Sequence, residues 1–254
     1  MTKVFVGVPV WHGIDVKAVH CFASLMVGAK DSIHFEMQEG DGLISRSRST
    51  LATKMLETDA DVMVMIDADI QFEPADFIKL VKSARATGQI VAGVYVTRAK
   101  KARPTIVPYP GTELSFVDSD SPNLMEVLYA SAGFMAVPRT VLEAMTEGTF
   151  QTINGPEPLW FCRGGPDERR VWDFYRMFVV RDDKGEPWWL EESYAFCERA
   201  RQLGFKTYAD TSIFLGHRAT VSMTIFDVET PGHAYGELGV PAYEALSLKK
   251  EVRV

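Results

Sequence analysis

The chain has 254 residues, 46% of them hydrophobic, which is enough for one large α/β domain with a sizeable core. Its net charge of -7 gives no overall positive field, so nucleic acid is disfavoured as a partner. Three widely spaced cysteines, Cys21, Cys162 and Cys197, exclude a disulfide framework and favour a reducing cytoplasm. No stretch approaches the roughly 20 apolar residues of a membrane span, and the N-terminus does not look like a signal peptide.

The first hundred residues show regular alternation of apolar strands and amphipathic helices. Strands are predicted at residues 4–10, 33–37, 62–66 and 89–95, with helices at 15–26, 43–57 and 74–85 between them. This order is typical of a parallel sheet built from right-handed crossovers. We therefore expect an α/β fold with a mostly parallel central sheet flanked by helices.

The pattern weakens after residue 95. A basic loop at 98–103 precedes a Pro-, Gly- and Ser-rich stretch, and residues 154–173 are expected to form an insertion over one face. The remaining predicted elements are strands at 124–130, 174–180, 206–209 and 213–215 and helices at 138–145 and 191–203. We expect one domain, 1–225, with a nucleotide-binding part at 1–100 and an acceptor-side part at 101–225. A tail, 226–254, would pack on the domain or on a second subunit.

Two aspartates, Asp67 and Asp69, follow the apolar strand at 62–66. Alternate residues of an extended chain point the same way, and open α/β sheets bind ligands beyond the carboxyl ends of their strands. Together with His217, which follows a strand of its own, they would suit Mn²⁺ or a similar ion that also takes phosphate oxygens. The alternative is a solvated turn with a structural histidine.

Charged residues at two helix starts are further candidates. Arg46 and Arg48 could bind an anion or simply form a charged first turn. Glu191 and Glu192 could cap a helix, and one of them could serve as a general base if it faced an acceptor hydroxyl. The basic loop at 98–103 could close over phosphates or remain a solvated charge run.

Aromatic residues gather in the second half of the sequence. They could form a platform for the face of a sugar, or they could pack in the core. They are Trp160, Phe161, Trp172, Trp188 and Trp189.

In their order along the chain, several motifs resemble the GT-A-fold glycosyltransferases, in particular family-two-like enzymes of bacteria and phages. The motifs are Arg46-Ser-Arg48, Asp67-Ala-Asp69, Gly93-Val-Tyr95, Ala132-Gly133-Phe134 with Pro138-Arg139, Glu192 to Arg199, and Gly216-His217. The resemblance implies a Rossmann-like sheet with a smaller mixed second sheet. It also implies a nucleotide-sugar donor, with a UDP-sugar as first choice, and Mn²⁺ or Mg²⁺.

The resemblance also assigns roles to residues. Asp69 would bind the metal directly, Asp67 would touch the ribose or the metal, and His217 would complete the protein ligands. Pro9 and Trp11 would border the nucleoside, and Arg48 would contact the nucleotide or its diphosphate. Arg46 would also belong to the donor-binding residues, and Gly133 would line the sugar pocket. The metal would neutralise charge on the departing diphosphate.

The chain departs from that pattern at two positions. It has Ser49 after Arg48 where relatives read Asn, and Ser193 after Glu192 where relatives read Asp. In inverting members that Asp often supplies the base, and serine cannot do so at neutral pH. We expect Glu192 or Glu191 to take the role; otherwise the enzyme retains configuration by another route or does not catalyse.

Other functions stay open on the sequence alone. A sugar-phosphate nucleotidyltransferase is one, although residues 9–15 lack a Gly-rich basic stretch for a triphosphate. A non-catalytic sugar-nucleotide-binding module is another. The acceptor could be a saccharide, a lipid-linked sugar, a protein or a modified DNA base.

Overall fold

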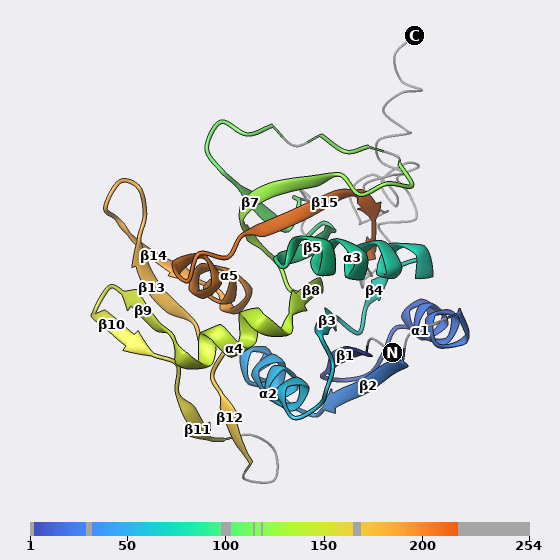
Figure 1. Ribbon diagram of the computed structural model, residues 1–254, viewed down its shortest axis with the longest axis horizontal. Helices are drawn as coiled ribbons and strands as arrows, with labels where there is room; N and C mark the ends of the chain where they lie inside the picture. Colours follow the sequence, from blue (N-terminus) through green and yellow to red (C-terminus); the bar gives the residue numbers. More distant parts are fainter. Residues whose placement is uncertain are drawn as a thin grey trace, which may run out of the picture.

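The computed structural model describes residues 3–28, 32–97, 103–113, 115–117, 119–164 and 169–217 (Figure 1). Its centre is an eight-stranded sheet in the order β2-β1-β3-β8-β5-β15-β7-β6. The predicted tail at 226–254 lies outside the described residues, as does most of the basic loop, 98–102. Association of two subunits through that tail stays a prediction.

The predicted alternation in the first half is confirmed. The strands are β1 (Lys3–Val10), β2 (Ser32–Glu39), β3 (Val62–Ile66) and β5 (Ile90–Val94), and the helices are α1 (Val16–Gly28), α2 (Ile44–Leu56) and α3 (Pro74–Thr87). Strand β1 pairs in parallel with β2 and with β3. Pro74 begins α3 and Gly88 ends it in the left-handed conformation, as helix-capping preferences lead one to expect.

The sheet is mixed, because β8 (Phe134–Pro138) runs antiparallel between β3 and β5. This strand was not predicted: Pro138 was read as the start of a helix, whereas that helix, α4 (Arg139–Glu147), begins one residue later. Two more antiparallel strands, β7 (Leu124–Ala130) and β6 (Ile106–Pro108), extend the sheet beyond β15 (Thr207–Phe214). Strand β15 joins the two short strands predicted at 206–209 and 213–215.

The second half adds helix α5 (Glu192–Gln202) and short antiparallel ribbons, which lie together at one end of the molecule (Figure 1). The ribbons are β9 (Thr149–Thr152) with β10 (Gly155–Pro158), β11 (Phe161–Arg163) with β12 (Arg170–Trp172), and β13 (Phe178–Arg181) with β14 (Pro187–Leu190). The predicted insertion at 154–173 supplies β10, β11 and β12. The strand predicted at 174–180 starts only at Phe178.

Alternating strand residues build a core on each face of the sheet. Phe5 and Met63 pack with α2, α4 and α5 on one face, while Val4 and Val64 pack with α1 and α3 on the other. The fold class predicted from the sequence, an α/β sheet covered by helices on both faces, is confirmed. In the part of the chain that the structure describes, no helix is both long and apolar enough to cross a membrane.

Candidate active site

The topology brings the predicted site residues to one edge of the sheet. Strands β1, β3, β5 and β15 run in the same direction, so the residues that follow them meet at their carboxyl ends. Strand β8 runs the opposite way and begins at that edge, immediately after Gly133. Asp67 and Asp69 follow β3 there, and His217 lies in a short strand, β16 (Gly216–His217), paired with β4 (Ile70–Gln71).

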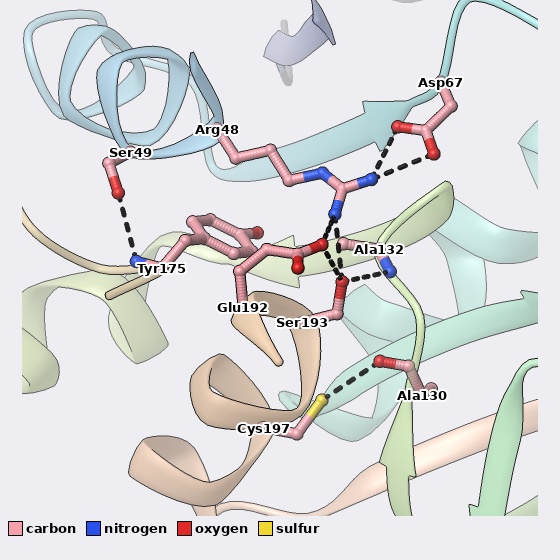
Figure 2. A network of polar contacts seen from close by, with 9 residues as sticks. All are labelled: Arg48, Ser49, Asp67, Ala130, Ala132, Tyr175, Glu192, Ser193 and Cys197. Atoms are coloured by element: carbon pink, nitrogen blue, oxygen red, sulfur yellow. Dashed lines mark hydrogen bonds and ion pairs between the residues drawn. The ribbon is translucent and has the colours of Figure 1, made fainter. Parts of the chain in front are cut away.

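A buried arginine, Arg48 of α2, connects three elements at this edge (Figure 2). Its Nη2 donates to both carboxylate oxygens of Asp67, at 2.7 and 2.9 Å. Its Nη1 donates to Glu192 Oε1 and, at 3.0 Å, to Ser193 Oγ, both at the start of α5. Burial by itself lowers the pKa of Arg48, but the charges of Asp67 and then Glu192 outweigh it and raise the pKa. Arg48 is therefore a fixed cation between the two carboxylates.

Ser193, which departs from the family pattern, has a place in this network. Its hydroxyl accepts from the backbone N–H of Ala132 at 3.2 Å and donates to Glu192 Oε1 at 3.1 Å. Because Ser193 is fully buried, these bonds satisfy a group that would otherwise be costly to bury. The serine thus positions Glu192 for Arg48 (Figure 2).

Gly133 lies so close to Asp67 and Tyr95 that a larger residue would require both side chains to move. Its carbonyl accepts from the Asp67 N–H at 2.9 Å. A Cβ atom at this position would be 2.3 Å from Tyr95 Oη and 2.8 Å from Asp67 Oδ2. Desolvation, followed by the charge of Asp67, raises the pKa of Tyr95, so its phenol stays protonated. The close backbone approach explains the glycine.

Asp69 and His217 form the part of the site that could hold a metal. His217 Nε2 is 3.8 Å from Asp69 Oδ1, and its Nδ1 is 2.7 Å from the Val96 carbonyl oxygen. Since a carbonyl can only accept, Nδ1 carries a proton and Nε2 faces the carboxylate. A carbonyl that accepts a hydrogen bond from one ring nitrogen in this way orients many metal-binding histidines.

The donor set of Asp69 and His217 fits Mn²⁺ or a similar ion but supplies only two protein ligands. Asp67, the third predicted ligand, is directed toward Arg48 instead (Figure 2). Among the described residues, no group of three His, Cys, Asp or Glu side chains converges on one point. A metal bound here would need oxygen atoms of a ligand, such as a diphosphate, to complete its shell.

The predicted nucleoside border lies beside the loop that follows β2. Pro9 is buried near the end of β1, and Trp11 is 55% exposed and lies against Gly42, where a Cβ would be 2.8 Å from the indole ring. Arg46 donates to both oxygens of Asp41 at 2.8 Å, and this hydrogen bonding lowers the pKa of Asp41. Arg46 therefore stabilises the loop and takes no part in the network of Arg48.

The two predicted bases differ in their surroundings. Glu192 is half-buried and engaged by Arg48 and Ser193, whereas Glu191 is exposed just before α5. Desolvation, followed by the charge of Glu192, raises the pKa of Glu191. Sequence reasoning missed the structural role of Ser193 and the carbonyl of Val96. Tyr95, by contrast, was part of the Gly93-Val-Tyr95 motif at the end of a predicted strand.

Comparisons with known proteins bear on the fold alone. No protein-family model and no curated protein matches the sequence. A solved structure, A197 from STIV, superposes with a TM-score of 0.52 at 15% identity and covers 87% of each chain. A glycosyltransferase involved in the glycosylation of the major capsid of PBCV-1 gives a TM-score of 0.30 at 11% identity, covering 54% of this chain and 62% of the other. The first of these supports a shared fold, and the second is too distant to carry an argument.

Proposed function

We propose that this protein is a glycosyltransferase that moves a sugar from a nucleotide-diphosphate sugar to an acceptor hydroxyl. One observation carries the proposal: the pair of Asp69 and His217 lies at the carboxyl edge of the sheet, next to Asp67 held by Arg48. Ligands of open α/β sheets bind at this edge. The exposed face of Trp11 at the end of β1 offers a surface for a nucleoside base, with a uridine nucleotide as first choice.

The residues of the site would serve two roles, donor binding and sugar transfer. Asp69 and His217 would hold a divalent cation, Mn²⁺ or Mg²⁺, which when bound supplies charge neutralisation for the departing diphosphate. Arg48 fixes the orientation of the Asp67 carboxylate. Asp67 would accept a hydrogen bond from the ribose. Gly133, whose backbone packs against Asp67 and Tyr95, would line the sugar pocket.

We assign the general base to Glu191 and a positioning role to Glu192. A base must present a carboxylate oxygen to the acceptor hydroxyl, and Glu192 already accepts bonds from Arg48 and Ser193. Glu191 is exposed and, among the described residues, accepts no side-chain bond that would hold it away from an acceptor, and its raised pKa strengthens it as a base. It would take the proton of the acceptor hydroxyl as the sugar is transferred.

Calorimetric titration with UDP in the presence and absence of Mn²⁺ tests the donor site. We expect binding that requires Mn²⁺ and weakens at least ~10-fold in Asp69→Ala and His217→Ala, because each variant removes one of two protein ligands. Asp59→Ala, which removes an exposed aspartate at a distance from the site, should bind as the wild type does. Binding of UDP that is indifferent both to Mn²⁺ and to Asp69→Ala would refute the proposal.

A non-catalytic sugar-nucleotide-binding module is the second candidate, favoured by the neutralisation of Glu192 by Arg48. Slow hydrolysis of a UDP-sugar distinguishes the two. We expect hydrolysis in the wild type and its loss, by ~10²-fold, in Glu191→Gln with UDP binding retained. No hydrolysis of any UDP- or GDP-sugar by a protein that binds the nucleotide would favour the module. Pyrophosphate released from UTP and a sugar phosphate would favour a nucleotidyltransferase.

A further inference from the structure

A cavity of about 600 Å³ lies between α2 and the ribbons of the second half. Ser45 and Ser49 of α2 form one wall, β11 and the residues around β12 and β13 form another, and Trp189 of β14 closes it. This volume lies within the range of small-molecule sites. Ser49 directly follows Arg48, so the cavity is next to the arginine network but on another side of α2.

The side chains in the cavity suit a molecule with both an apolar face and polar groups. Val171, Phe178 and Val179 give it an apolar floor. Trp189 is 69% exposed. The preceding Trp188 packs inward, and its ring centroid is 5.4 Å from that of Tyr129. An exposed tryptophan at the mouth of an apolar cavity is typical of a surface on which a ring can stack.

Two of the three arginines that line the cavity are paired with carboxylates. Arg176 donates to Glu157 at 2.7 Å and forms an ion pair with Asp173 at 2.6 Å. Arg46, also in the lining, is paired with Asp41. These pairs offer fixed donors and acceptors to hydroxyl groups without a strong positive field, so they favour a neutral polyhydroxyl ligand over a polyanion such as DNA.

The assigned base, Glu191, lies two residues after Trp189 in the chain but is not part of the cavity lining. Leu190 is fully buried, and Glu191 has extended backbone angles, φ -64° and ψ 169°, so Trp189 and Glu191 project to the same side of the chain. A ring stacked on Trp189 would therefore present its hydroxyls toward Glu191.

We propose that this cavity binds the acceptor, and that the acceptor is a saccharide stacked on Trp189. This inference rests on the proposed function and specifies its substrate class. It assigns Trp189 as the specificity-determining contact for the acceptor and leaves the donor site at Asp69 and His217 untouched.

Binding of neutral sugars tests the assignment directly. The probes are methyl glycosides of glucose, galactose, mannose and N-acetylglucosamine, with 5-hydroxymethyldeoxycytidine as the competing class, measured by saturation-transfer NMR. We expect at least one glycoside to bind and Trp189→Ala to weaken it ~10-fold or more, because stacking is lost. Trp160→Ala is the matched control: Trp160 is 53% exposed in the same region but does not line the cavity. It should change binding less than twofold.

The exposed thiol of Cys162 supplies a second measurement, because this residue lines the cavity. The bound glycoside should slow the alkylation of Cys162 by N-ethylmaleimide at least threefold. Peptide mass spectrometry measures the rate of this alkylation. Binding only of the nucleoside, glycoside binding indifferent to Trp189→Ala, or the absence of any binding would overturn the inference. Retention of Mn²⁺-dependent UDP binding in Trp189→Ala shows that the variant is folded. If the wild type binds a glycoside in this way but not UDP, the proposed function fails while the sugar site stands.

Discussion

At the scale of single residues, Gly133 sets the geometry of the candidate donor site. In Gly133→Ala the added Cβ would meet Tyr95 Oη at 2.3 Å and Asp67 Oδ2 at 2.8 Å, so both side chains must move. We expect a loss of about 1–3 kcal/mol in the free energy of unfolding, typical of overpacking, together with weaker UDP binding. Urea denaturation and calorimetry measure the two effects. Gly28→Ala, at a position with open space around it, should change stability by less than ~0.5 kcal/mol. Equal stability of both variants would show that the contact is not tight.

At the scale of elements, the sequence predicts those strands and helices that a local hydrophobic pattern determines. Strands β1, β3 and β5 are continuous apolar runs separated by helices, so their order and the placement of Asp67 after β3 could be predicted. Strand β8 could not be predicted, because it has only five residues, follows Gly133 and ends in a proline. Its position depends on pairing with β3, more than 60 residues earlier in the chain. The ribbons were also missed in part, since strands of three or four residues carry little pattern, and β11 is exposed throughout.

The link between α3 and the start of β3 gives a prediction at the same scale. Arg85 donates to both oxygens of Asp61, at 2.8 and 2.9 Å, and this hydrogen bonding lowers the pKa of Asp61. A carboxyl group with a lowered pKa stabilises the fold above its unfolded pKa of about 3.9, and this contribution is lost as the pH falls through the folded value. The pair is partly exposed, so Arg85→Ala should cost only ~0.5–1 kcal/mol at pH 7.

The pH dependence of this cost separates the ion pair from other effects of the substitution. The difference between Arg85→Ala and the wild type, measured by urea denaturation, should begin to shrink below about pH 5. It should vanish only below the lowered folded pKa of Asp61, where Asp61 is protonated in both proteins. Lys82→Ala, which removes an exposed cation of the same helix, should show no such change. A difference that is constant with pH would mean that Arg85 stabilises the protein through packing alone.

At the scale of the whole molecule, Arg48 joins the two halves of the chain. It bonds to Asp67 at the end of β3 and to Glu192, which is 144 residues away in sequence, at the start of α5. No local pattern could have predicted that contact, which is why the sequence pointed to Arg48 as a nucleotide ligand and to Glu192 as a base. The observed network instead fixes the candidate donor site relative to helix α5 (Figure 2).

Substitution of Arg48 by methionine should therefore be among the most destabilising changes in the protein. Arg48→Met leaves Asp67 and Glu192 without their cation in a largely buried site, and we expect a loss of about 3–5 kcal/mol in urea denaturation. Adding Asp67→Asn and Glu192→Gln to Arg48→Met should recover part of that loss, because the uncompensated charges are then removed. The stability of Arg48→Lys should lie between those of the wild type and Arg48→Met, since an ammonium group keeps the charge but cannot reproduce the forked contacts. If the triple variant is no more stable than Arg48→Met, packing around the side chain, not charge, dominates at this position.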